Sequence, residues 1–247
     1  MNFKTGLGTF LVSFLYSQSL CAQTILFPSD SLVSAELVKY QKEEMVWYLH
    51  KDSQKSAIAD IETTINPDYE NTRMLVVQQV KMNGSPKVWC DTTVVDRITL
   101  SPIYHSSFNS QREMVLNFAG REITGYYKTL ADNQIMNIED TVRARFHDSN
   151  FYPHLIRFLP LKAGYQARIP IYDFNPKKHG LLFATITRVT DGGAAIDSQE
   201  AIPCFVVEVI DEIAPHARST YYISKKDRRL IKSDISVGEK RMSIESR

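Results

Sequence analysis

The chain has 247 residues, 43% of them hydrophobic, and its 29 lysines and arginines nearly balance 28 acidic residues, giving a net charge of +1. This balance, without a basic stripe interleaved with aromatic residues, excludes the usual electrostatic footprint of a nucleic-acid-binding protein. The length allows a full hydrophobic core in one domain or two small ones. Beyond the N-terminal segment, no stretch approaches the roughly twenty apolar residues of a membrane-spanning helix, so we expect a soluble mature chain without a transmembrane segment.

The N-terminal 22 residues have the pattern of a secretory signal peptide. Lys4 supplies a positive charge, Phe10 to Tyr16 form an apolar run, and Ala22 offers a cleavage point. A core helix or a membrane anchor is the alternative, and the shortness of the apolar run argues against it. Leu20 before Cys21 does not fit the small residues of a lipoprotein box. We therefore predict an exported protein, periplasmic or otherwise extracytoplasmic, with a mature chain spanning 23–247.

The next segments alternate between apolar and polar residues, which is typical of strands. A short amphipathic helix is predicted first, over Ser31 to Gln41, with Leu32, Ala35 and Leu37 or Val38 on one side. Strands rich in β-branched and aromatic residues follow at Met45–His50, Ala57–Ile65, Arg73–Met82, Lys87–Asp96, Pro102–Phe108 and Arg112–Phe118. Asn83-Gly84 and Ala119-Gly120 favour hairpin turns, so the strands are expected to form one antiparallel meander.

His147 to Tyr165 is the only segment with a strong helical pattern. Four apolar residues recur at helical spacing behind three candidate caps and ahead of a breaking proline. The apolar residues are Phe151, Leu155, Phe158 and Leu159, the caps are Asp148, Ser149 and Asn150, and the proline is Pro160. One apolar helix among many strands predicts a sheet that curves around it.

A second run of strands is predicted after this helix. It comprises Ala167–Asp173, Leu181–Thr190, Cys204–Asp211, Thr220–Ser224, Arg229–Val237 and Arg241–Ile244, with turns at Asp191-Gly192-Gly193 and Lys226-Asp227. The chain contains no internal repeat and no linker long enough to separate two domains. We predict a mainly β protein with few helices, in which a large curved antiparallel sheet forms an incomplete barrel around one or two helices.

The sequence contains no recognisable catalytic or metal motif. A nucleophile elbow is missing, and His105 beside Ser106 and Ser107 is interpreted as a solvated strand end. The six histidines are scattered without ligand spacing; His154, on the predicted helix, receives no role. Glu208, Asp211 and Glu212 are interpreted as charges on the outer face of a strand rather than as a glycosidase pair. We predict no enzyme activity, no catalytic residue, no metal site and no cofactor.

Two further features each allow two interpretations. Cys90 and Cys204, the cysteines outside the signal segment, can pair in an oxidising compartment or remain two separate buried thiols. The basic cluster Lys225, Lys226, Arg228 and Arg229 favours a solvated hairpin tip over a docking surface for an anionic membrane or partner.

Three segments resemble a bacterial family, the domain of unknown function 3108, whose sheet is similar to that of the LolA and LolB lipoprotein carriers. They are WCDTTVVDRITLSPIYHS, FYPHLIRFLPLKAGYQARIPIY and STYYISKKDRRLIKSDI. The matched positions are Val95, Asp96, Leu100 and Pro102 in the first, Leu159, Pro160, Leu161 and Gly164 in the second, and Tyr221, Tyr222, Lys226, Leu230 and Ile231 in the third. The resemblance implies an incomplete barrel curved around helices, without established catalytic residues, and a single LolA-like domain over 23–247.

The resemblance and the apolar helix together point to binding. Carrier relatives hold acyl chains between sheet and helix, so we expect a lipid, an acyl chain or another apolar ligand here, carried alone or on an acylated protein. The expected lining consists of Trp47, Trp89, Phe118, Phe151, Leu155, Phe158 and Phe205. The alternative is a non-enzymatic scaffold for an envelope protein partner, with a hollow filled by its own side chains. A hydrolase remains a third hypothesis.

Overall fold

The computed structural model describes residues 24–30, 37–196, 200–214 and 216–247. The strands are β1 (Thr24–Ile25), β2 (Gln41–Lys51), β3 (Gln54–Tyr69), β4 (Arg73–Met82), β5 (Val88–Asp96), β6 (Pro102–Phe108), β7 (Arg112–Ala119), β8 (Glu122–Thr129), β9 (Ile135–Thr141), β10 (His147–Asp148), β11 (Ala167–Asn175), β12 (Lys178–Ala194), β13 (Ile202–Asp211), β14 (Ala217–Ser224), β15 (Leu230–Val237) and β16 (Lys240–Ser246). Between β10 and β11 lie the short helix α1 (Tyr152–Leu155) and the 3-10 turn η2 (Ile156–Phe158).

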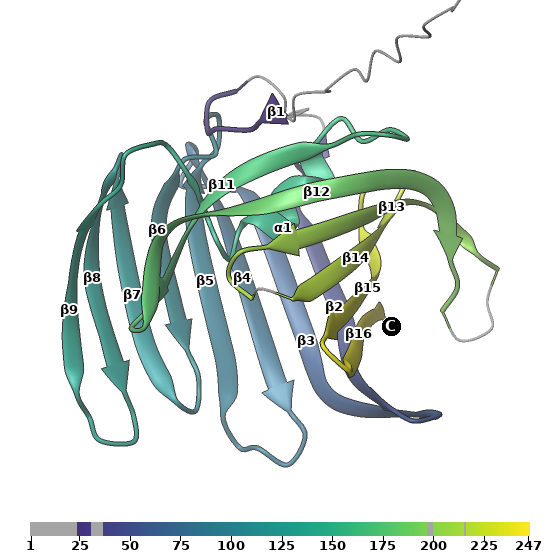
Figure 1. The fold of residues 1–247 in the computed structure, drawn as a ribbon, viewed down its shortest axis with the longest axis horizontal. Coiled ribbons are helices and arrows are strands. Elements are labelled where there is room, and N and C mark those ends of the chain that lie inside the picture. Colours follow the sequence, from purple (N-terminus) through teal and green to yellow (C-terminus); the bar gives the residue numbers. More distant parts are fainter. Residues whose placement is uncertain (1–23, 31–36, 197–199, 215) are drawn as a thin grey trace, which may run out of the picture.

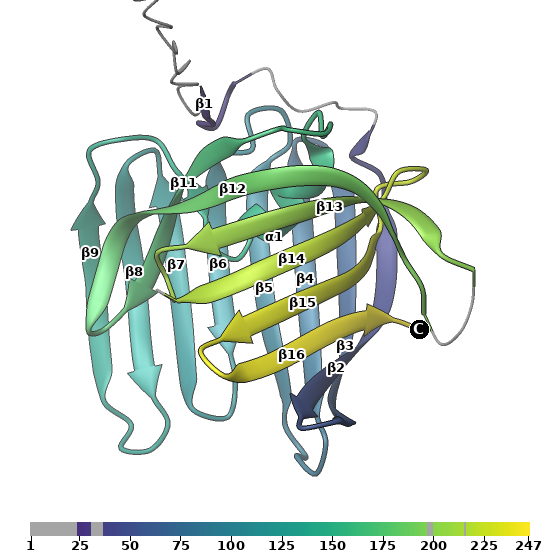
Figure 2. The same cartoon turned by 45° about the vertical axis from the view of Figure 1, so that its right-hand side comes forward.

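All the strands belong to one open sheet. Its order is β1-β11-β12-β13-β14-β15-β16-β2-β3-β4-β5-β6-β7-β8-β9, with β10 beside β11. Neighbouring strands are antiparallel, except that β1 and β10 run parallel to β11. The sheet bends where β16 meets β2, so that β11–β16 cross in front of β2–β9 and α1 lies between the two halves (Figures 1 and 2). The predicted fold class, a mainly β protein with a large curved sheet, is confirmed.

Alternation explains why these segments form strands. In β3 the residues Ala59, Ile61 and Ile65 are buried, and the intervening Asp60 and Glu62 are not, which is the period-two pattern of a strand with one covered face. The turns predicted at Asn83-Gly84 and Lys226-Asp227 are present, and the β7–β8 turn lies at Gly120-Arg121, one residue later than predicted. Gly84 and Gly120 adopt φ of 77° and 67°, the left-handed region that glycine enters without steric cost.

Two predictions are wrong, the length of the helix and one of the turns. The helix is confined to α1 and η2, because His147 and Asp148 form β10 against β11 instead of starting a helix. Asp191-Gly192-Gly193 is no turn: β12 continues through it, with Gly192 opposite Cys204. A Cβ at Gly192 would lie 2.7 Å from Val206 Cγ2, so the missing side chain permits close strand packing.

The three predicted cap residues have tertiary partners instead. Asp148 binds His105 and Thr93, Ser149 donates to Asp173, and Asn150 donates to Thr93. The actual N-cap of α1 is Phe151, which makes no side-chain cap. Of the amphipathic helix predicted over 31–41, residues 31–36 lie outside the described part; Leu37 and Val38 pack against the core, and Gln41 begins β2.

The main core fills the space between the two halves of the sheet. Phe151, Leu155, Phe158 and Leu159 are each no more than 1% exposed, so the apolar spacing of this segment did identify core residues. They pack with β3, β4 and β5 on one side and with β11, β12, β13 and β14 on the other. In the described part of the chain no helix is both long and apolar enough to cross a membrane.

Candidate functional site on the inner face of the sheet

The face of the sheet that contacts α1, called the inner face below, can be followed from strand to strand. Tyr221, Ser233, Ile244, Trp47 and Ala59 lie directly opposite one another across β14, β15, β16, β2 and β3. Residues opposite each other in an antiparallel ladder share a face. Because Tyr221 belongs to the same core cluster as Phe151, this whole row is on the inner face.

Both tryptophans of the chain lie in one cluster on the inner face, away from α1. This tryptophan cluster consists of buried Met45, Ala59, Ile61 and Val80 and of partly buried Trp47, Met82, Trp89, Leu230 and Ile244. Trp89 is opposite Val80, and Trp47 is opposite Ala59. The rings therefore lie on the same side of β2–β5 and keep some solvent exposure.

The inner face carries several buried donors without a partner in the described structure. They are Trp47 Nε1, Trp89 Nε1, Ser233 Oγ and Arg112 Nε. Arg112 is on the same face. Trp89 and Asp91 are two residues apart on β5 and therefore share its inner face, and Asp91 is opposite Ser107, which is opposite Met114, two residues from Arg112 on β7. An unpaired buried polar group costs about 1–3 kcal/mol, so each of these donors would be stabilised by a hydrogen-bond acceptor.

A buried polar network also lies on the inner face, where β10 packs against β5 and β6. The carboxylate of Asp148 on β10 lies 2.8 Å from His105 Nδ1 on β6 and accepts a 2.8 Å hydrogen bond from Thr93 Oγ1 on β5. Asn150 Nδ2 donates to the same Thr93 oxygen at 3.2 Å. The network fixes β10 against the inner face of β5 and β6.

Electrostatics in this network favour the protonated imidazole. Burial alone would lower the pKa of His105, but the charge of Asp148 and its hydrogen bond, with smaller contributions from Asp91 and Asp173, raise it overall. Burial also raises the pKa of Asp173, against the hydrogen bond from Ser149. A carboxylate thus orients His105, as in catalytic triads, yet the nearby Ser107 contacts Arg112 Nη2 at 3.4 Å.

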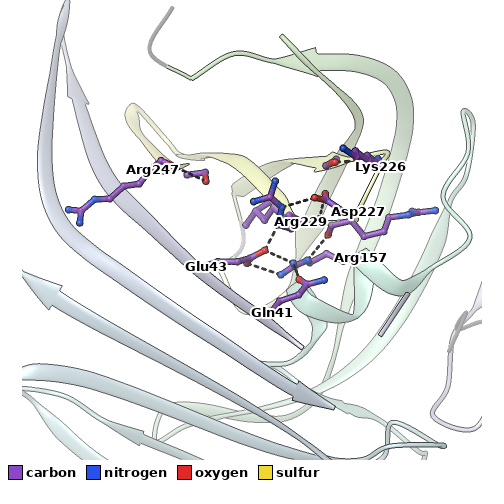
Figure 3. A network of polar contacts seen from close by, with 11 residues as sticks. Gln41, Glu43, Arg157, Lys226, Asp227, Arg229 and Arg247 are labelled. Atoms are coloured by element: carbon purple, nitrogen blue, oxygen red, sulfur yellow. Dashed lines mark hydrogen bonds and ion pairs between the residues drawn. The ribbon is translucent and has the colours of Figure 1, made fainter. Parts of the chain in front are cut away.

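The segment carrying α1 and η2 is fixed to the sheet by Arg157. Its guanidinium donates to Glu43 on β2 at 3.0 and 2.5 Å, to Gln41, and to the carbonyl oxygen of Arg228 at 2.9 Å (Figure 3). Arg229 and Asp227 form a further ion pair at 2.7 Å beside this network. The basic hairpin is therefore joined to the helical segment and is more than the solvated tip predicted from sequence.

The predicted apolar lining is divided among three clusters. Phe151, Leu155 and Phe158 are in the main core, and Phe205 packs against it under Lys225 and Arg228. Phe118 belongs to a second cluster with edge-to-face contacts to Phe146 and Tyr172. Only Trp47 and Trp89 share the third. Of the seven, Leu155 lines a pocket of about 20 Å³, enough for one water beside His147.

The remaining candidate residues have structural partners. Cys90 and Cys204 are free and lie on β5 and β13, which are not neighbours in the sheet. Glu208 pairs with Arg188 on the outer face, as predicted, and Glu212 accepts from the backbone of Phe183. Asp211 contradicts its prediction, because it accepts a 2.7 Å hydrogen bond from Tyr152 of α1.

The histidines also differ from their sequence interpretation. His105 with Ser106 and Ser107 is buried instead of forming a solvated strand end, and His147 is 2% exposed with neither ring nitrogen hydrogen-bonded. Backbone of Leu26 and Leu100 lies beside the His147 ring without completing a bond, and burial lowers its pKa to about 4. Burial and Arg157 lower the pKa of partly buried His154 to about 3. Within the described residues no group of three His, Cys, Asp or Glu side chains could hold a metal ion.

Sequence reasoning missed Arg112, Ser233 and the partner of His105. Alternation places His105 and Ser107 on one face of a strand, and this signal was available. It does not show that Asp148, 43 residues later, lies against that face.

The fold defines a mainly β protein with one open, bent sheet, and its inner face carries a polar and aromatic surface. The chain matches the family model described as "Protein of unknown function (DUF3108)" over residues 37–245, and it therefore belongs to this family. A search of curated proteins finds no match.

Proposed function

We propose that the protein binds an amphiphilic ligand, an acyl chain or similar apolar molecule that carries a hydrogen-bond acceptor, at the tryptophan cluster. The observation that carries this proposal is the set of unpaired inner-face donors, Trp47 Nε1, Trp89 Nε1, Ser233 Oγ and Arg112 Nε. The apolar body packs on the partly buried rings, and its acceptor receives a hydrogen bond from an indole N–H of the cluster. Each buried CH₂ contributes about 0.8 kcal/mol, so a short chain suffices for binding.

This site differs from the hollow expected from sequence. Phe151, Leu155 and Phe158 are closed inside the main core, and Arg157 holds that segment against β2. A ligand there would have to displace a packed core. The tryptophan rings remain partly exposed, so an apolar chain can reach them without displacing the main core, and a local side-chain movement brings its acceptor to the buried indole N–H groups. The resemblance to the LolA and LolB carriers supports the ligand class only by analogy.

The two tryptophans make the proposal directly measurable. A fatty acid brominated on its chain should quench tryptophan emission in a saturable manner. Trp47→Phe and Trp89→Phe each leave one reporter, and both single variants should still be quenched if the chain contacts both rings. The double variant Trp47→Ala/Trp89→Ala should lose binding measured by native mass spectrometry. Tyr40→Ala, which removes an aromatic ring that is 62% exposed elsewhere, is the matched control.

Two results would reject this site. One is quenching that never saturates, and the other is equal lipid uptake by the double alanine variant and the Tyr40→Ala control. Native mass spectrometry of protein from its own source, followed by organic extraction, would identify a resident ligand and its chemical class.

A second candidate function, a scaffold for a protein partner, is favoured by the edge strand β9. Its only neighbour among the described strands is β8, and Ile135 and Met136 are 64% and 47% exposed. An extended segment of a partner could add to this edge. Met136→Lys should then abolish the complex seen by light scattering, whereas Val88→Lys, at an apolar side chain 49% exposed on β5, should not.

Either function is proposed for an exported, non-catalytic protein. Residues 1–22, which lie outside the described part, have the signal pattern. N-terminal sequencing of protein recovered outside the cytoplasm should begin at Gln23. Recovery of an intact Met1 in the cytoplasmic fraction alone would contradict export.

A further inference from the structure

A second polar surface lies on the opposite, outer face of the sheet. Arg218, Ser236, Arg241 and His50 are directly opposite one another across β14, β15, β16 and β2. Each of these residues is next to an inner-face residue in its own strand, and successive strand residues point to opposite faces. The side chains of this row therefore point away from the tryptophan cluster. Together with Thr220, Asp234 and the edges of Ile235 and Met242, these residues line a groove of about 400 Å³.

The groove carries an excess of positive charge. Arg218 and Arg241 are exposed, and neither has an ion pair or a side-chain hydrogen bond among the described residues. The one carboxylate of the lining, Asp234, lies 3.1 Å from Lys232 Nζ, so its charge is already offset. Two guanidinium groups on strands separated only by β15 therefore face the same space without a counter-charge. Such planar forks match the oxygens of phosphate.

His50 at the end of the groove is oriented by buried groups. Its Nε2 lies 2.8 Å from Ser243 Oγ, and that hydroxyl donates to Glu245 Oε1 at 2.7 Å. Because the serine proton is used for Glu245, His50 Nε2 carries the hydrogen that Ser243 accepts. Ser243 is fully buried, and Glu245 also receives Lys55 Nζ at 2.5 Å. This chain holds the imidazole in place at the mouth of the groove.

We propose that this outer groove binds a phosphate group, held between Arg218 and Arg241 with His50 beside it. Phosphate is favoured over a single carboxylate because two separate arginine forks can engage different oxygens of a tetrahedral anion. The phosphate could belong to free inorganic phosphate or to a lipid headgroup. The site is independent of the proposed ligand site, since the sheet lies between them.

Isothermal titration with inorganic phosphate tests the first source. We expect saturable binding to the native protein and at least about tenfold weaker binding to Arg218→Gln/Arg241→Gln, because hydrogen bonds to charged groups are among the stronger ones. Arg143→Gln is the control, since Arg143 is exposed outside the groove and has no ion pair among the described residues. Arg218→Lys/Arg241→Lys keeps the charge without the fork and should bind with intermediate affinity.

Co-sedimentation with vesicles tests the second source. Phosphatidylglycerol vesicles, compared with phosphatidylcholine vesicles, should bind the native protein and the Arg143→Gln control but not the double glutamine variant. Phosphate binding supports the free-anion source, and selective vesicle binding alone supports the headgroup source. Circular dichroism melting verifies that all variants fold. Absence of both activities in the native protein, or equal losses in Arg143→Gln and the double glutamine variant, overturns the proposal.

Discussion

Glu43 on β2 and Arg157 in η2, 114 residues apart in the chain, form a two-point ion pair with N–O distances of 3.0 and 2.5 Å. Both side chains are buried, at 7% and 1% exposure. Gln41 and the carbonyl oxygen of Arg228 each accept one further guanidinium hydrogen. The segment that contains α1 and η2 is thus tied both to β2 and to the hairpin between β14 and β15.

Breaking this pair should strongly destabilise the fold. Arg157→Met leaves the Glu43 carboxylate buried and uncompensated, and we expect a loss of about 3–5 kcal/mol in the free energy of unfolding. Urea denaturation monitored by tryptophan fluorescence gives this value. The double variant Arg157→Met/Glu43→Leu removes both charges and should recover part of the loss.

The matched control is Arg97→Gln, which breaks an exposed ion pair with Asp68. We expect a change below about 1 kcal/mol, because solvent screens such pairs. Equal effects of Arg97→Gln and Arg157→Met would show that the buried pair does not anchor the helical segment.

Much of the sheet could be predicted from sequence, because alternation reports directly on burial. Ala59, Ile61 and Ile65 follow the pleat and were assigned to a strand, and Asn83-Gly84 marked its neighbouring hairpin. The strand β9 was missed. Its residues Ile135 and Met136 are exposed at the sheet edge, so they do not produce an alternating pattern.

The start of the helix and the grouping of the site residues depend on tertiary contacts that cannot be inferred from sequence spacing. Asp148 has the residue type of a helix cap, but the buried His105 and Thr93 take its carboxylate, and tertiary bonding overrides the local preference. Likewise, Trp47 and Trp89 were assigned to the same lining as Phe158. Only the strand register shows that they belong to a separate cluster.

Alkaline conditions should remove the stability contributed by His105. Its folded pKa is raised above the ordinary 6.5, so the contribution is complete below that pH and is lost as pH rises through the folded pKa. Asp148→Asn removes the main cause of the increase and leaves burial, which should bring the imidazole pKa below 6.5. An NMR titration of the His105 ring measures both pKa values. Asp68→Asn, at an exposed carboxylate, should leave the ring unchanged, and an unaltered His105 curve in Asp148→Asn would refute the assignment.

Acid should act through His147 with the opposite sign. Burial lowers its pKa from 6.5 to about 4, so its contribution is present above pH 6.5 and is lost as pH falls toward 4. The difference corresponds to on the order of 3 kcal/mol. His147→Gln, which does not titrate, should reduce the slope of unfolding free energy against pH in this window. His154→Gln should produce a separate reduction, because the pKa of His154 is lowered to about 3. Slopes identical to the native slope would exclude both histidines as the acid-sensitive groups.

A single glycine sets how closely β7 and β8 approach. A Cβ on Gly125 would lie 1.9 Å from the carbonyl oxygen of Val115, whereas nothing lies within 4 Å of a Cβ on Gly84. Gly125→Ala must therefore push the two backbones apart, and we expect a loss of more than about 2 kcal/mol in urea denaturation. Gly84→Ala meets only the cost of its left-handed conformation, about 1 kcal/mol. Because Leu116 lies between Gly125 and His105 in the same row, the first variant should also perturb the His105 ring in NMR spectra, and the second should not. If Gly125→Ala were as stable as Gly84→Ala, the ladder would tolerate a wider spacing and Gly125 would not position the polar network.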